Sequence, residues 1–153
     1  MESKLKKLVE FKELSNLYID LSEDILKNLI FDSSIEDKQS QLLFINCVEN
    51  SISFLADHIH TSFTNQLESI NHLNFKYKWV ELCKLESIEI VIQKELDNDG
   101  LIEIVEDSKK RIFSINNDNL ISTNKENDLK KFSLILNKYK TFDELLRKIL
   151  EEC

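Results

Sequence analysis

Apolar residues recur at steps of three and four along most of the chain, which is the spacing of amphipathic helices. The first stripe covers residues 4–31 and predicts a long N-terminal helix, with a break near Ser22. No apolar run approaches the roughly 18 residues that a membrane span needs. The pattern therefore indicates a mainly α protein whose helices each bury one face.

The second stripe predicts a helical core over residues 35–98. It begins after Ser33, which forms a capping box with Glu36 and so satisfies two backbone amides of the first turn. The short polar residues at 60–62 mark a candidate break, because their side chains compete for backbone hydrogen bonds. Residues 75–98 form either one helix or two helices joined by a turn.

The periodicity changes at Gly100, the only glycine, which is placed where a left-handed helix C-cap would lie. Residues 101–105 and 111–115 are rich in β-branched and aromatic side chains and flank the polar segment 106–110. Such a pattern is typical of a β-hairpin. One hairpin is therefore predicted at 101–115.

Two further capping boxes predict two helices in the last part of the chain. Thr123 with Glu126 marks a helix at about 124–139, and Thr141 with Glu144 marks another at about 142–152. A length of 153 residues is that of a single domain, so these helices should pack on the same core as the preceding ones.

The order of helix, glycine and hairpin resembles the recognition helix and wing of bacterial winged helix-turn-helix regulators. The resemblance is carried by LDNDGLIE at 96–103 and by KKRIFSI at 109–115. The wider element order is similar to that of the MarR-like family, and INHLNFK at 70–76 is similar to the segment that enters the recognition helix in its staphylococcal accessory regulator branch. A PCI-type winged helix has the same helix-then-hairpin signature and is left open.

This resemblance implies a winged-helix domain flanked by a long N-terminal helix and two C-terminal helices, which in the MarR-like family pair to make a dimer. It also implies DNA binding through a recognition helix, which lies either at 76–86 or at 87–98. We favour the second range, because it adjoins the expected wing. Winged helices also serve as adaptors that never touch DNA, so the fold alone does not decide the function.

The charge of the chain changes what such a helix could bind. The net charge is −8, which disfavours general binding to nucleic acids or anionic membranes. Most of the excess lies in residues 86–108, which carry eight carboxylates and one lysine. Carboxylates repel phosphates, whereas they complement a basic protein surface. The expected protein-binding face of the favoured helix consists of Glu86, Glu89, Ile90, Gln93 and Asp97.

Two groups of basic residues are the candidates for contact with nucleic acid. One is a strip that also contains Tyr77 and Trp79, and the other is the tip of the expected hairpin. Together they comprise Lys76, Lys78, Lys84, Lys109, Lys110 and Arg111. Contacts from the hairpin tip to phosphates would position the protein on DNA without reading its sequence.

No residue pattern indicates catalysis, a metal or a cofactor. His58 and His60 are two residues apart, so on a helix they point about 200° away from each other and cannot share a metal ion as an i, i+4 pair does. Cys47, Cys83 and Cys153 fit neither a disulfide framework nor a CxxC metal site, and we expect reduced thiols. One glycine cannot build a phosphate-binding loop.

These observations predict a cytoplasmic protein with neither a signal peptide nor a membrane anchor. The leading hypothesis is a non-enzymatic binding or regulatory protein that contacts a protein partner through its acidic helical face. The alternatives are a dimeric MarR-like DNA-binding transcriptional regulator and an acidic inhibitor that mimics nucleic acid. The wide apolar faces of the terminal helices predict a homodimer, against the alternative of an intramolecular bundle.

Overall fold

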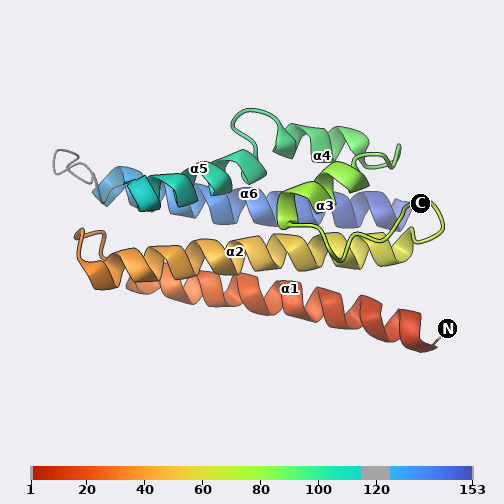
Figure 1. Cartoon of the computed structure of the whole chain (residues 1–153), viewed down its shortest axis with the longest axis horizontal. Coiled ribbons are helices and arrows are strands. Elements are labelled where there is room, and N and C mark those ends of the chain that lie inside the picture. The colour runs from red at the N-terminus through yellow and green to blue at the C-terminus, as the bar shows by residue number, and fades with distance from the viewer. Residues whose placement is uncertain (1, 115–124, 153) are drawn as a thin grey trace.

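The computed structural model describes residues 2–114 and 125–152, which form six helices (Figure 1). In chain order they are α1 (Glu2–Asn28), α2 (Ile35–Ser62), α3 (Phe75–Leu82), α4 (Glu89–Leu96), α5 (Leu101–Ser114) and α6 (Lys125–Glu152). Helices α1, α2 and α6 have 27 or 28 residues, so each is about 40 Å long. Within the described ranges there is no β-strand, and no helix combines the length and apolarity of a membrane span.

The three long helices run along the longest axis of the molecule (Figure 1). Helix α1 is antiparallel to α2, whereas α6 runs in the same direction as α2. A buried hydrogen-bond cluster joins them at mid-length. In it, the Ser15 hydroxyl of α1 lies 2.6 Å from the Tyr139 hydroxyl of α6 and donates to the Ser51 carbonyl of α2 at 2.9 Å. The shorter α3, α4 and α5 complete the core by packing against α2 and α6.

Aromatic side chains hold α6 against the rest of the core. The rings of Phe44 and Phe132 stack with centroids 4.7 Å apart, and Phe31 meets Phe132 edge-on at 5.4 Å. Farther along α6, Phe142 meets the fully buried Trp79 of α3 edge-on at 4.9 Å. Aromatic pairs in these geometries stabilise a core beyond the area that they bury. The chain therefore folds around one continuous core.

The predicted β-hairpin is wrong, and with it the winged-helix fold, because residues 101–114 form the helix α5. The buried side chains of α5 are Leu101, Ile102, Val105, Ser108 and Ile112. Their spacing places them on one helical face, which packs against α2 and α6. The β-branched composition favoured a strand, but β-propensities differ by only about 1 kcal/mol and burial of this face outweighs them. The expected hairpin tip, 106–110, is the middle of α5.

The junction between α4 and α5 explains the single glycine. The residue with a left-handed backbone is Asp99 (φ 63°), not Gly100. A Cβ atom on Gly100 would lie 2.4 Å from the carbonyl oxygen of Glu95, so only glycine lets α5 start this close to the end of α4. The Glu95 carboxylate in turn accepts a hydrogen bond from the Leu101 amide at 2.7 Å and caps α5.

The two predicted C-terminal helices are one continuous helix, α6. Its buried face consists of Phe132, Ile135, Leu136, Tyr139, Phe142 and Leu146. This stripe passes Thr141 without interruption, so Thr141 lies inside the helix and does not cap one. A Thr-x-x-Glu match marks a helix start only where the preceding residues are not already helical. The other expected cap, Thr123, lies outside the described residues.

The helices predicted between residues 4 and 98 are present, but some of their ends and caps lie at other residues. Helix α1 continues through Ser22, whose hydroxyl donates to the Ile19 carbonyl at 2.7 Å instead of ending the helix. The N-cap of α2 is Ser34, which accepts a hydrogen bond from the Asp37 amide at 3.1 Å, so the capping box at Ser33 is off by one residue. Helix α2 ends at Ser62, at the candidate break, and the range 75–98 forms two helices, α3 and α4.

Candidate binding sites

The expected acidic face gathers on α4. A wide hollow of about 580 Å³ is lined by Glu89, Ile90, Gln93, Lys94, Asp97 and Asn98. Ile90 is 84 % exposed, more than any other large apolar side chain in the described ranges. Glu86 is also exposed, but it lies in the turn before α4 and does not line the hollow. The structure thus brings four of the five predicted residues together.

Packing of α4 determines which side faces solvent. Ile88 and Ile92 are buried, and their spacing of four residues places them on one face. On the exposed side, the Gln93 amide donates to the Asp97 carboxylate at 2.8 Å. The Gln93 carbonyl oxygen accepts a hydrogen bond from the Cys83 thiol, with 3.5 Å between the two heavy atoms. The hollow therefore combines one uncovered aliphatic side chain with an ordered amide and two carboxylates.

The six predicted basic residues do not form one surface. Five of them pair with carboxylates: Lys76 with Glu106 (3.1 Å), Lys78 with Asp57 (2.7 Å), Lys84 with Glu81 (2.8 Å), Lys109 with Glu49 (3.1 Å) and Arg111 with Asp128 (3.5 Å). The sixth, Lys110, is exposed on α5. A phosphate would have to displace a carboxylate at each of the five pairs, which weakens the electrostatic attraction on which nucleic-acid binding depends.

Lys78 is part of the core. Its side chain is 7 % exposed and that of its partner, Asp57 of α2, is 6 % exposed. The second carboxylate oxygen of Asp57, Oδ1, has no hydrogen-bond partner among the described residues. Two buried charges must neutralise each other, so this ion pair ties α3 to α2. Because both side chains are buried, the pair is not accessible to a ligand.

A hollow between α2, α3 and α5 places aromatic side chains beside basic ones. It has a volume of about 310 Å³, and Phe75, Phe113 and Lys110 are among its lining residues. An aromatic ring beside a lysine is what a base-stacking site requires. However, Glu49 and Glu106 line the same hollow and would repel a phosphate. The aromatic strip expected from the sequence is also divided, because Trp79 is fully buried.

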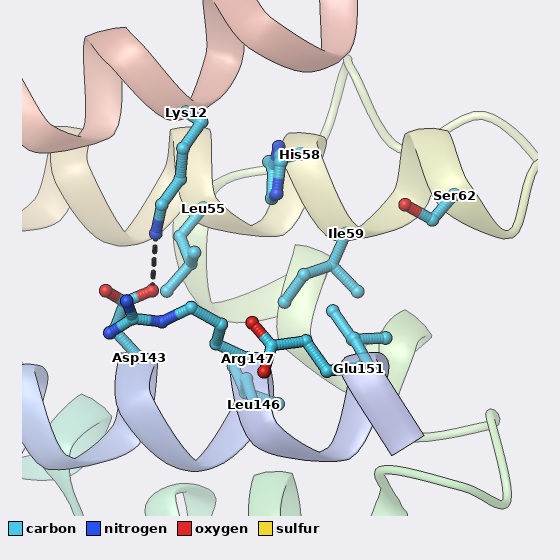
Figure 2. A pocket seen from close by; sticks show the side chains of 10 residues that line it. Lys12, Leu55, His58, Ile59, Ser62, Asp143, Leu146, Arg147 and Glu151 are labelled. Carbon is cyan, nitrogen blue, oxygen red and sulfur yellow. Dashed lines mark hydrogen bonds and ion pairs between the residues drawn. The ribbon is translucent and has the colours of Figure 1, made fainter. Parts of the chain in front are cut away.

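A further pocket lies where α1, α2 and α6 meet (Figure 2). It has a volume of about 220 Å³, with aliphatic side chains at its base and charged side chains at its rim. Lys12 of α1 contacts Asp143 of α6 at 2.6 Å, and the His58 Nδ1 atom of α2 lies 2.9 Å from the Leu8 carbonyl of α1. These two contacts hold the three helices around the pocket.

The described histidines and cysteines do not gather into a metal site. In the described ranges, no three His, Cys, Asp or Glu side chains lie close enough to hold a metal ion. Burial raises the pKa of Cys47 and of Cys83, which keeps both thiols protonated at neutral pH. Cys153 lies outside the described residues. Burial, with a smaller contribution from Lys12, lowers the pKa of His58.

The pocket between α1, α2 and α6 was missed because its residues come from three distant segments. Lys12 and Asp143 are 131 positions apart, and each looks like an ordinary solvent-exposed charge in its own helix. The only local signal is that both lie at the edge of an apolar stripe.

Comparison of the chain with protein-family models, with curated proteins and with solved structures finds no match. The function of these candidate sites is therefore inferred from their own residues.

Proposed function

We propose that this chain is a non-enzymatic protein-binding module whose α4 face receives a basic segment of a partner protein. The observation that carries the proposal is Ile90, which stands 84 % exposed within the hollow of α4. Binding energy at protein interfaces concentrates in a few apolar anchors that become fully buried inside a polar rim. Ile90 has the position of such an anchor, and the hollow beside it can receive an apolar side chain of the partner.

The charge around Ile90 supports a basic partner. Glu86 and Glu89 have no ion-pair partner among the described residues, and the Asp97 carboxylate accepts a hydrogen bond from the neutral Gln93 amide. Lysine or arginine side chains would meet these carboxylates at the rim, which favours association and the choice of partner more than raw affinity. Among the described residues, Lys94 is the only base that lines the hollow.

The rigidity of α4 supports the same proposal. Ile88 and Ile92 anchor the helix in the core, and the hydrogen bond from the Leu101 amide to the Glu95 carboxylate at 2.7 Å ties the end of α4 to α5. A surface that is already ordered loses little conformational entropy on binding. The α4 face therefore suits recognition without rearrangement.

Selection of peptides tests the proposal. A displayed library of random peptides is selected on the full chain, and the recovered peptides are titrated against wild type, Ile90→Glu and Ile35→Glu. Ile35 is 72 % exposed at the start of α2, so it gives the same substitution at a similarly exposed isoleucine outside the α4 face. We expect basic peptides with an apolar residue, whose affinity falls about 10-fold or more for Ile90→Glu and is unchanged for Ile35→Glu.

Two outcomes would contradict the proposal. One is that selection enriches no basic peptide, and the other is that both variants bind equally well. The salt dependence provides a second criterion, because rim charges act largely on the association rate and are screened above a Debye length of about 8 Å at physiological ionic strength. Substituting Glu86 and Glu89 together with Gln should therefore reduce the salt dependence of the association rate.

DNA binding remains the second candidate, and Lys110 with Phe113 is the one observation that favours it. A gel shift with genomic fragments at low salt tests it. Retardation that is lost in Lys110→Glu would support a DNA-binding function, and no retardation at micromolar protein would exclude it. A nucleic-acid mimic would instead compete with DNA for a basic enzyme groove, and that competition would be insensitive to Ile90→Glu.

A further inference from the structure

The pocket between α1, α2 and α6 has the size and lining of a site for a small apolar group. Its base consists of Leu55 and Ile59 from α2 with Leu146 and Leu150 from α6. The volume of about 220 Å³ lies below the roughly 300–1,000 Å³ of sites for drug-sized ligands. An occupant is therefore small, with an aliphatic portion that contacts these four side chains.

The rim of this pocket carries both signs of charge. Lys12 and Asp143 neutralise each other at 2.6 Å. Arg147 and Glu151, both exposed on α6, have no ion-pair partner among the described residues. In Figure 2 the Arg147 guanidinium lies beside Asp143, whereas the Glu151 side chain lies below Ile59 with its carboxylate turned toward the Arg147 side chain. A free cation and a free carboxylate thus stand on the same rim.

His58 adds a hydrogen-bond acceptor. Because the Leu8 carbonyl can only accept, the Nδ1 atom 2.9 Å away carries the proton, and Nε2 of the neutral ring presents a lone pair. Burial lowers the pKa of His58, so the ring is neutral at pH 7. Nε2 has no partner among the described residues, and the residue lines the pocket.

We propose that this pocket binds a free aliphatic amino acid, a zwitterion whose side chain fills the apolar base. The carboxylate would lie at Arg147, beside Lys12, and the ammonium group at Glu151 with Nε2 of His58. A ligand with a net charge leaves one of the two free rim charges without a counterpart, whereas a zwitterion matches both. No residue of the α4 face lines this pocket, so the inference is independent of the proposed protein-binding function.

The test compares three ligands that share one aliphatic group and differ in charge: L-leucine, 4-methylpentanoate and 3-methylbutylamine. Each is titrated at matched pH and ionic strength into the ¹⁵N-labelled full chain, and amide chemical shifts are followed. We expect saturable shifts around residues 55–59 and 143–150, with a leucine Kd on the order of 1 mM. Leucine should bind at least about 5-fold more tightly than either analogue. Absence of saturable shifts with leucine, or equal binding of an analogue, would overturn the proposal.

Two variants and one matched control test which rim side chain contacts the carboxylate of the ligand and which contacts its ammonium group. Arg147→Gln should weaken leucine and 4-methylpentanoate and leave 3-methylbutylamine unchanged, while Glu151→Gln should weaken leucine and 3-methylbutylamine only. Lys148→Gln removes a charge at the neighbouring position, where the side chain is 64 % exposed, pairs with Glu144 and does not line the pocket. If Lys148→Gln changes leucine affinity as much as Arg147→Gln does, the assignment is wrong.

Discussion

At the scale of single residues, the pair of Lys78 and Asp57 has the largest predicted effect on stability. Removing one partner leaves the other charge buried and uncompensated, which destabilises proteins by about 3–5 kcal/mol. We therefore expect Lys78→Met to lower the free energy of unfolding by that amount in urea titrations. The double variant Lys78→Met with Asp57→Leu, which removes both charges, should recover most of the loss.

The matched control is Lys76→Met in the same helix. Lys76 is 40 % exposed and pairs with Glu106 at 3.1 Å, and exposed pairs of this kind contribute about 0–1 kcal/mol. A loss for Lys78→Met no larger than that for Lys76→Met would show that Lys78 does not carry a buried charge.

His58 predicts a dependence of stability on pH. Burial lowers its pKa in the folded chain, whereas the unfolded chain keeps a pKa near 6.5, so the unfolded state binds more protons below that pH. The stability that neutral His58 provides is therefore complete above pH 6.5 and is lost as the pH falls toward the folded-state pKa. Each pH unit in this window removes up to about 1.4 kcal/mol.

The comparison that isolates this effect is between wild type, His58→Gln and His60→Gln in urea titrations at pH 7.5 and pH 5.5. His58→Gln should lose less stability between the two pH values than wild type, because it has no proton to bind. His60, whose ring contacts the Glu68 carbonyl outside the pocket, is the matched histidine. An identical pH dependence for wild type and His58→Gln would contradict this explanation.

At the scale of elements, the sequence pattern predicted the helical regions before residue 98. It failed at 101–114, where composition and periodicity disagreed, and at Thr141, where a capping-box match divided α6. Leu101, Val105 and Ile112 have helical spacing, but the β-branched side chains around them also fit a hairpin. The decisive interactions are tertiary: the buried face of α5 and the cap on Leu101 from Glu95. Neither can be recognised before the position of α4 is known.

The junction between α4 and α5 predicts an effect of substituting the glycine. Gly100→Ala places a methyl group 2.4 Å from a backbone carbonyl that cannot move without shifting α4, so we expect a loss of about 1–3 kcal/mol in unfolding free energy. Asp99→Gly should be neutral or stabilising, because Asp99 has the left-handed backbone (φ 63°). The opposite pattern, with Gly100→Ala tolerated and Asp99→Gly destabilising, would place the chain reversal elsewhere.

Thr141 distinguishes one continuous C-terminal helix from two. Inside α6, Thr141→Ala should stabilise the protein by up to about 0.7 kcal/mol, because alanine is the better helix former and Thr141 is exposed. If Thr141 were an N-cap, the same change would destabilise by about 1 kcal/mol. The sign of the change in unfolding free energy therefore decides between the two structures.

At the scale of the whole molecule, the sequence indicates a single mainly helical domain and does not reveal how its surfaces are distributed. It identified Glu89, Ile90 and Gln93 as one face because residues on one short helix keep their relative positions whatever the tertiary fold. It could not show that Lys78 is buried, because that depends on Asp57 in another helix. Groups of residues within one helix could be predicted from the sequence, whereas groups of residues assembled from distant segments could not.

The outer surface of α1 bears on the predicted homodimer. The buried stripe of α6 packs within the chain, and Leu129, Leu134 and Leu145 of the same helix stay exposed. Helix α1 keeps four exposed apolar side chains, Leu5, Val9, Leu17 and Leu21. Self-association through α1 stays a prediction.

We propose that a mainly helical scaffold presents the α4 face as its binding surface. The most direct test is an amide chemical-shift map of the ¹⁵N-labelled full chain, titrated with a basic peptide recovered by selection. We expect saturable shifts concentrated at residues 86–98, which are absent in Ile90→Glu and retained in Ile35→Glu. Shifts that cluster on another helix, or that persist in Ile90→Glu, would contradict it.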